Sequence, residues 1–142
     1  MTYFKIKSYA KINLALNVIG KLSNLHKIES IVAFISLHDE ILIKKINSDK
    51  HKISFSGKFS KKKKKNNTVS KFLDVLKKKK ILINKKFQIK IHKNIPNQAG
   101  LGGGSMNAAN LLSYFVKKKI INVSRKNIIE ISGSKVPKTR KI

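Results

Sequence analysis

A run of glycines between a strand-like segment and a helix-like segment is the feature that most restricts the structures this chain can adopt. Glycine stands at positions 100, 102, 103 and 104, after alternating apolar residues at 87–91 and before an apolar stripe that begins at Ala108. A strand that leads through glycines into a helix directs the unpaired N–H groups of the first helical turn at one point, where the helix dipole adds positive potential. Without side chains, the backbone can approach an anion closely. The segment therefore predicts a phosphate-binding loop.

The spacing within this loop separates it from two other phosphate-binding sequences. It lacks the Lys-Ser/Thr ending of a Walker loop, and its glycines do not follow the G-x-G-x-x-G fingerprint of dinucleotide-binding folds. The alternative is a flexible connection before a core helix. Four glycines followed by Ser105 at the expected start of the helix favour phosphate binding over that alternative.

Periodic apolar positions outline the remaining elements. The expected strands cover residues 4–6, 12–18, 28–37, 41–46, 53–55 and 87–91. The expected helices cover residues 69–76 and about 105–118. We interpret His38-Asp39-Glu40 as a tight polar turn, with Asp39 as a turn residue. The order of elements predicts an α+β domain with a mixed sheet.

Polar residues are expected to gather on one side of the second strand. Lys11, Asn13 and Asn17 alternate with Ile12, Leu14, Leu16 and Val18, so the lysine and the two amides should share one face.

The net charge of +27 allows two interpretations. Attraction to phosphates would suit a nucleic-acid-binding module, whereas lysine-rich and isoleucine-rich drift in an AT-rich genome would place the same charge on solvated positions. The few aromatic residues mostly occupy periodic apolar positions, which leaves little for base stacking.

The absence of cysteine, of a signal-like N-terminus and of a long apolar segment predicts a cytoplasmic protein with no membrane contact.

Four motifs, in order along the chain, resemble the GHMP family of small-molecule kinases. The motifs are Ala10-Lys11-Ile12-Asn13-Leu14, His26 with Ile28 and Ser30, Asn67-Thr68-Val69, and the segment from Leu101 to Ala109. Triple glycine followed by Ser-x-Asn-Ala-Ala is similar to the branch that phosphorylates a cytidine-diphosphate-linked polyol of the non-mevalonate isoprenoid pathway. The resemblance implies a GHMP-kinase N-terminal domain (ribosomal protein S5 domain 2-like) over residues 1–134, with helices on one face of the sheet.

The resemblance also implies the ligands and the site residues. ATP, accompanied by Mg²⁺, would give its γ-phosphoryl group to the 2-hydroxyl of the polyol, with Lys11 as the catalytic residue beside that hydroxyl. Asn13 and His26 would bind the substrate, His26 at the cytidine base, although His26 also suits a surface position. The implied ATP-binding residues are Asn67, Pro96, Asn97, Gln98, Ala99, Gly100, Leu101, Gly102, Gly103, Gly104, Ser105 and Met106. Asn67 suits a turn equally well.

One segment departs from the family pattern. Kinases of this branch carry a catalytic aspartate in Gly-x-Asp-Val-Pro, whereas this chain has Lys135 at that position, between Gly133 and Pro137. The family continues into a second domain, so we expect an N-terminal fragment with a frayed tail at 135–142, no C-terminal domain, and weak or no kinase activity alone. A basic nucleic-acid-binding module and a nucleotide-binding pseudokinase are the alternatives.

Overall fold

A computed structural model describes residues 2–60, 67–124 and 126–128. The segment 133–142, for which the sequence predicted a missing aspartate and a frayed tail, lies outside the described residues. The described elements, in chain order, are β1 (Phe4–Leu22), β2 (Leu25–Ile46), β3 (Lys52–Ser56), α1 (Thr68–Lys78), β4 (Lys86–His92) and α2 (Gly103–Lys117).

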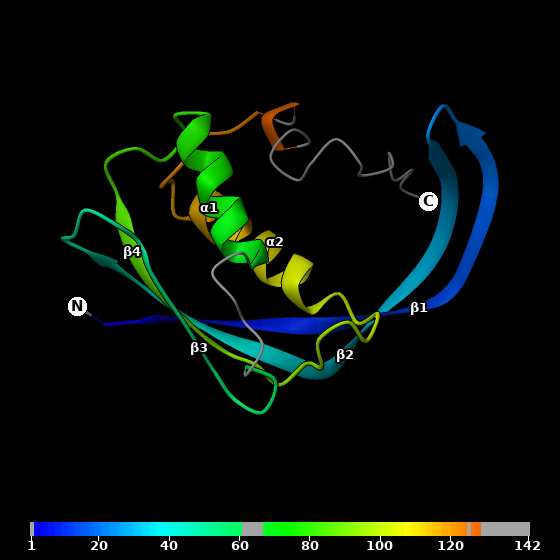
Figure 1. The fold of residues 1–142 in the computed structure, drawn as a ribbon, viewed down its shortest axis with the longest axis horizontal. Coiled ribbons are helices and arrows are strands. Elements are labelled where there is room, and N and C mark those ends of the chain that lie inside the picture. The colour runs from blue at the N-terminus through cyan, green and yellow to red at the C-terminus, as the bar shows by residue number, and fades with distance from the viewer. Residues whose placement is uncertain (1, 61–66, 125, 129–142) are drawn as a thin grey trace.

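The strands form one mixed sheet in the order β1-β2-β4-β3. The pairs β1–β2 and β2–β4 are antiparallel, while β3 runs parallel to β4. Both helices lie on one face of the sheet (Figure 1). The predicted α+β class, mixed sheet and one-sided helices are therefore confirmed.

The first two strands are longer than the sequence predicted. Residues 4–22 form one strand and residues 25–46 another, where four shorter strands were expected. Three register shifts in β1, one of them between Asn13 and Ala15, interrupt the strict alternation, so the expectation that Asn17 shares a face with Lys11 loses its basis.

The predicted turn at 38–40 is wrong. Asp39 pairs with Ser8 across the β1–β2 ladder, and Glu40 pairs with both Lys7 and His92, so β2 continues through this tripeptide. A polar tripeptide can remain in a central strand when its polar groups find partners, and the Asp39 carboxylate finds them far away in the sequence.

The core lies between the sheet and the helices. Phe72 and Leu76 of α1 and Phe115 of α2 pack against apolar residues of β2 and β4, with the rings of Phe87 and Phe115 centred 5.0 Å apart. The fully or nearly fully buried apolar residues of the two strands are Ile41, Ile43, Phe87, Ile89 and Ile91. Burial of the stripe predicted at 69–76 is confirmed, and it fixes α1 beside α2.

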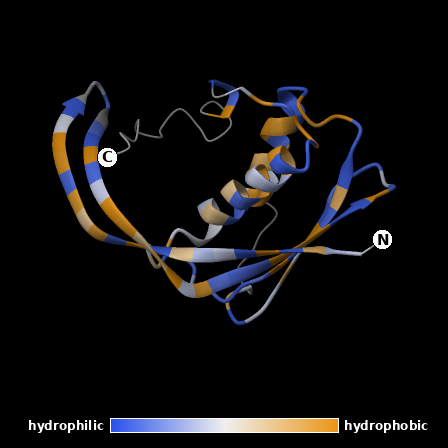
Figure 2. Ribbon diagram, turned by 180° about the vertical axis from the view of Figure 1, so that it is seen from behind, coloured by the Kyte–Doolittle hydropathy of each residue, from blue (hydrophilic) through white to orange (hydrophobic). Residues whose placement is uncertain are grey.

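The outer half of the β1–β2 hairpin carries a large exposed apolar surface. The hairpin extends beyond the helices and curves toward their side of the sheet, with hydrophobic segments along both strands (Figures 1 and 2). The exposed apolar residues are Leu14, Leu16, Val18, Ile19, Ile28, Ile31, Val32 and Phe34. Surfaces of this kind are typical of interaction sites.

His51 makes the fold sensitive to mild acid. Its Nδ1 accepts a hydrogen bond from the Phe87 N–H at 3.2 Å, which requires an unprotonated nitrogen. Burial lowers the pKa of His51, and the charges of Lys86 and Lys77 lower it further, against a smaller opposite effect of Asp74. The folded chain therefore binds fewer protons than the unfolded chain, and stability is lost as the pH falls through about 6.5, the unfolded value.

We expect His51→Gln to remove that part of the acid sensitivity. Urea unfolding of the wild type and the variant at pH 7.5 and pH 5 gives the loss of unfolding free energy in each protein. Subtracting one loss from the other cancels the contribution of the other histidines. Equal losses of unfolding free energy in both proteins would contradict the assignment to His51.

Candidate active site

The glycine loop joins β4 to α2 through backbone conformations that glycine adopts readily. Gly100 and Gly102 have φ angles of 71° and 70°, and Gly102 is the N-cap of α2. The helix begins at Gly103, two residues before the predicted start, and no side chain in the described part of the chain caps its first turn. The N–H groups of that turn therefore remain available to a ligand, and the helix dipole favours an anion there.

A cavity of ≈ 480 Å³ opens at this loop. It is lined by Thr68, Lys93, Pro96, Asn97, Gln98, Ala99, Gly100, Leu101, Gly102, Gly103, Gly104 and Ser105. The loop residues predicted for ATP binding, 96–105, thus surround one space. Met106 packs beside this space, with its Cγ 3.5 Å from the place that a Cβ on Gly102 would occupy.

The start of α1 forms another wall of the cavity. Asn67 is the N-cap of α1: its Oδ1 accepts from the Ser70 N–H, and its Nδ2 donates to Ser70 Oγ, both at 2.9 Å. The next residue, Thr68, lines the cavity, and its Oγ1 lies 2.9 Å from the place of a Cβ on Gly104. Thr68 was not predicted as a lining residue, although it stands in the Asn67-Thr68-Val69 motif.

Because Thr68 lies so close to Gly104, we expect substitutions at the two helix starts to have coupled effects on stability. Overpacking against Thr68 in Gly104→Ala should destabilise the fold by about 1–3 kcal/mol. The higher helix propensity of alanine should offset about 1 kcal/mol of this loss. Adding Thr68→Ala removes the obstructing hydroxyl, so the double variant should be more stable than the sum of the single effects predicts. Urea unfolding of the four proteins gives the coupling free energy, and simple additivity would show that the helix starts do not touch.

Lys11 lies against the glycine loop. Its backbone N–H donates to the Leu101 carbonyl at 3.0 Å, and its Cε lies 3.5 Å from the place of a Cβ on Gly102. Strand β1 thus brings the predicted catalytic lysine to the predicted phosphate loop. Asn13 follows in unbroken register, so it shares the face of Lys11, and its side chain is exposed.

His26 is not brought together with Lys11. It lies at the far end of the hairpin, opposite Lys21, and its side chain is exposed. Lys11 pairs with Phe34, eight residues from His26 along β2, which is on the order of 25 Å along the strand.

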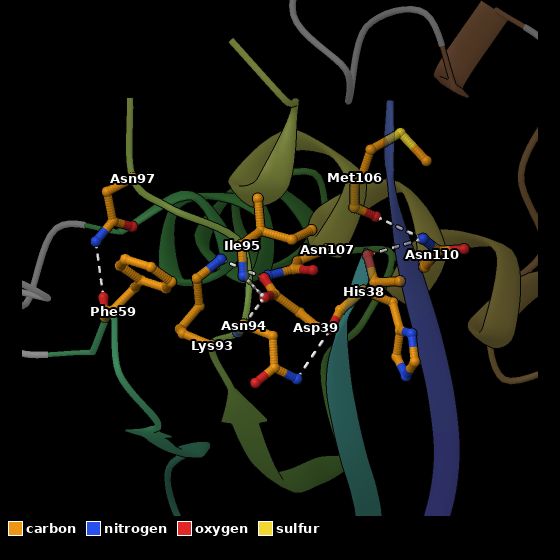
Figure 3. A network of polar contacts seen from close by, with 11 residues as sticks. His38, Asp39, Phe59, Lys93, Asn94, Ile95, Asn97, Met106, Asn107 and Asn110 are labelled. Carbon is orange, nitrogen blue, oxygen red and sulfur yellow. Dashed lines mark hydrogen bonds and ion pairs between the residues drawn. The ribbon is translucent and has the colours of Figure 1, made fainter. Parts of the chain in front are cut away.

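A buried ion pair lies beneath the loop (Figure 3). The Lys93 ammonium is paired with the Asp39 carboxylate, and the two side chains are 1% and 0% exposed. Lys93 Nζ also lies 3.3 Å from the place of a Cβ on Gly103, directly under the start of α2. Lys93 was not predicted as a site residue and Asp39 was predicted only as a turn residue, because a single aspartate carries no signal of a partner 54 positions away.

Asp39 also binds the backbone that leads into the loop. Its Oδ1 accepts from the N–H groups of Asn94 and Ile95 at 2.8 and 2.9 Å, and its Oδ2 accepts from Asn107 Nδ2 of α2 at 3.0 Å. Burial raises the pKa of Asp39, but hydrogen bonds from Lys93, Ile95 and Asn107 outweigh burial and hold the pKa below its ordinary value. The carboxylate is therefore charged at neutral pH.

A metal-binding cluster and a membrane-spanning helix are both absent from the described ranges. Within residues 2–60, 67–124 and 126–128, His, Asp and Glu form no group of three or more that could hold a metal ion. No helix in the same ranges has the length and apolar character needed to cross a bilayer.

The fold, the glycine loop and the lysine beside it define a class of small-molecule kinase. The chain belongs to the GHMP kinase family. The family model of the GHMP kinases N terminal domain matches residues 67–137, which are half of this chain. This finding confirms the resemblance drawn from the motifs and does not favour a nucleic-acid-binding module.

Two curated relatives of this chain carry the same name. The chain is 58% identical over 133 residues to 4-diphosphocytidyl-2-C-methyl-D-erythritol kinase of Pelagibacter ubique, covering 94% of this chain and 47% of the relative. It is 39% identical over 128 residues to the protein of the same name from Finegoldia magna, covering 89% and 45%. The chain thus spans about half the length of these curated relatives.

Solved structures show the same fold. A crystal structure of 4-(cytidine 5'-diphospho)-2C-methyl-D-erythritol kinase matches with a TM-score of 0.67 at 21% identity, covering 94% of this chain and 46% of that one. Lactococcus lactis galactokinase complexed with galactose matches with a TM-score of 0.62 at 18% identity, covering 94% and 37%. The arrangement of sheet and helices is therefore shared with kinases of several names.

Proposed function

We propose that this chain forms the nucleotide-binding half of a kinase for 4-diphosphocytidyl-2-C-methyl-D-erythritol in the non-mevalonate isoprenoid pathway. The reaction is transfer of the ATP γ-phosphoryl group to the 2-hydroxyl of this polyol. The observation that carries the proposal is the uncapped start of α2 on a glycine loop, with Lys11 bonded to that loop. The relatives named above supply the acceptor.

The residues of the cavity fit the phosphates of ATP. A Cβ on Gly100 would meet no atom of the described residues within 4 Å, so the loop has room there, and the first-turn N–H groups of α2 would donate to phosphate oxygens. The residues at 96–106 would surround the nucleotide, and Asn67 would border its adenine side from the start of α1. Mg²⁺ bound with ATP would supply charge neutralisation at the phosphates.

Lys11 and the hairpin would hold the acceptor. The Lys11 ammonium would stand near the 2-hydroxyl and stabilise negative charge that develops during transfer. Asn13 shares its face and would contact the polyol, while His26 would offer a ring nitrogen to the cytosine base. The curvature of the hairpin toward the helix side supports an extended acceptor lying along it (Figure 1).

The test separates nucleotide binding from phosphoryl transfer. Calorimetry of the 142-residue chain with ATP and Mg²⁺ should show binding, whereas phosphorylation of the cytidylyl polyol should be weak or absent with this chain alone. Adding the complementary half of the Pelagibacter ubique relative as a second polypeptide should raise the rate. Absence of ATP binding would sink the proposal, and turnover by the chain alone at the rate of an intact kinase would contradict the expected weakness.

Lys11→Met tests the assigned lysine in the reconstituted mixture. Loss of a charge that acts on the transferring group should lower kcat by about 10²–10³-fold while ATP affinity changes little. Lys7→Met, an exposed lysine on the same strand, is the matched control and should keep its rate. A Lys11→Met variant as active as this control would remove Lys11 from the site.

Two other outcomes would favour the alternatives. ATP binding without transfer, in either arrangement, would favour a nucleotide-binding pseudokinase. Salt-dependent RNA binding without affinity for ATP would favour a basic nucleic-acid-binding module.

A further inference from the structure

We propose that Asp39 is a positioning residue of the glycine loop, acting through Lys93 and Asn107. The inference rests on the proposed function only where it concerns ATP, since the contacts themselves belong to the free chain. Asp39 lies in β2 and does not itself line the cavity, but its carboxylate is paired with Lys93, which does. It acts by holding three pieces around the phosphate space: the side chain of Lys93, the backbone that follows it, and the first part of α2.

The first two pieces lie where the chain enters the loop. The two backbone N–H groups of Asn94 and Ile95 both donate to Asp39 Oδ1, which fixes the direction of the chain just after β4. Lys93, paired with Oδ2, forms the floor under Gly103. The path from β4 into the loop is therefore set by one carboxylate.

The third piece is the first part of α2. Asn107 donates through Nδ2 to Asp39 Oδ2 at 3.0 Å, and its own Oδ1 is buried and has no hydrogen-bond partner among the described residues. Rotating the amide by 180° would turn Oδ1 toward the carboxylate and repel it, so Asp39 fixes the orientation of this side chain. An unpartnered buried oxygen costs free energy, and the fold retains it in exchange for the contact between α2 and Asp39.

These contacts hold both ends of the glycine loop at one point. The anchored backbone ends at Ile95 and the anchored helix residue is Asn107, so the residues between them form a closed loop. Closing the loop limits the conformations open to Gly102 and Gly103, whose N–H groups would otherwise spread over more directions. A loop held in its binding conformation loses less entropy when a ligand arrives.

A simpler role would be neutralisation of the buried Lys93 charge. That role needs only the ion pair, and neither Asn107 nor the loop N–H groups would matter to it. Asn107→Leu distinguishes the two roles, because it leaves the Asp39–Lys93 pair and the backbone hydrogen bonds in place and replaces the amide with a side chain of similar size.

Amide hydrogen exchange of the ligand-free chain is the direct measurement. The amides of Lys11 and Met106 report on the loop, because they donate to the Leu101 and Gly102 carbonyls at 3.0 and 2.8 Å. For a positioning role, Asn107→Leu should raise their exchange, the loop exchange, about tenfold or more, while the amides of β3 and the midpoint of thermal unfolding stay near wild type. Asp39→Asn should raise loop exchange by at least as much. Asn110→Leu is the control, since Asn110 lies on the same helix and donates to Ser8 and Met106 instead.

The outcomes separate this inference from the proposed function. Wild-type loop exchange in Asn107→Leu would overturn the positioning role, even if the chain binds ATP. Faster loop exchange in a chain that binds no ATP would uphold the positioning role and defeat the proposed function. When both hold, the ATP dissociation constant of Asn107→Leu should rise about tenfold, with that of Asn110→Leu unchanged.

Discussion

Lys93→Met is expected to lower the free energy of unfolding by about 3–5 kcal/mol, because it leaves the Asp39 carboxylate buried without its cation. Methionine fills much of the same volume, so the loss measures charge more than packing. Domains of this size have total stabilities of about 5–15 kcal/mol, and the variant should therefore unfold at much lower urea concentration. Urea titration monitored by circular dichroism measures the change.

Lys71→Met is the matched control, because Lys71 is an exposed lysine on α1. Its unfolding free energy should change by less than about 0.5 kcal/mol. A similarly small change in Lys93→Met would mean that the carboxylate and the ammonium do not depend on each other.

The stability that the wild-type ion pair contributes also depends on pH. Because the pKa of Asp39 is lowered in the folded chain, this contribution to the free energy of unfolding is present above about pH 3.9 and is lost as the pH falls further.

Gly103→Val is expected to weaken ATP binding by about 10–100-fold. A Cβ at this position would lie 3.2 Å from Ile95 Cγ2 and 3.3 Å from Lys93 Nζ, so the floor of the cavity or the start of α2 must move. Overpacking of this kind costs about 1–3 kcal/mol, and a shift of the first-turn N–H groups removes donors from the phosphates. Calorimetry with ATP and Mg²⁺ gives the affinity, and thermal unfolding confirms that the variant is folded.

Gly20→Ala is the control for replacing a glycine outside the loop. Its Cβ would meet Lys27 Cβ at an ordinary 3.9 Å, far along the hairpin, so ATP affinity should stay at the wild-type value. Gly100→Asn tests the loop itself at an open position, since asparagine tolerates a left-handed φ angle. Unchanged ATP affinity in Gly103→Val would count against the assignment of the loop as a phosphate site.

Local patterns in the sequence located the elements around the glycine loop. The strand at 87–91, the loop and the following helix depend on residues that are close in the chain, and their apolar spacing and glycines identify them directly. The same holds for α1, whose apolar stripe was predicted at 69–76. The motifs at Lys11 and in the glycine loop also led to the GHMP family, which the family model confirms.

Long-range contacts explain where the sequence interpretation was wrong or incomplete. The tripeptide at 38–40 has the composition of a turn, and only pairing with β1 and β4 keeps it in a strand. Thr68 became a cavity residue because α1 packs beside α2, and His26 was separated from Lys11 because two long strands form one extended hairpin. None of these outcomes follows from neighbours in the chain.

The sequence by itself determined the glycine loop, the two helices with their buried stripes, and the family. Each depends on backbone preference and on the spacing of residues along the chain, and both are present in the sequence. The tertiary structure alone decided that Asp39 is the buried partner of Lys93 and that Lys11 reaches the loop. A charged group can be buried in a strand only when its partners arrive from distant segments, and folding brings those segments together.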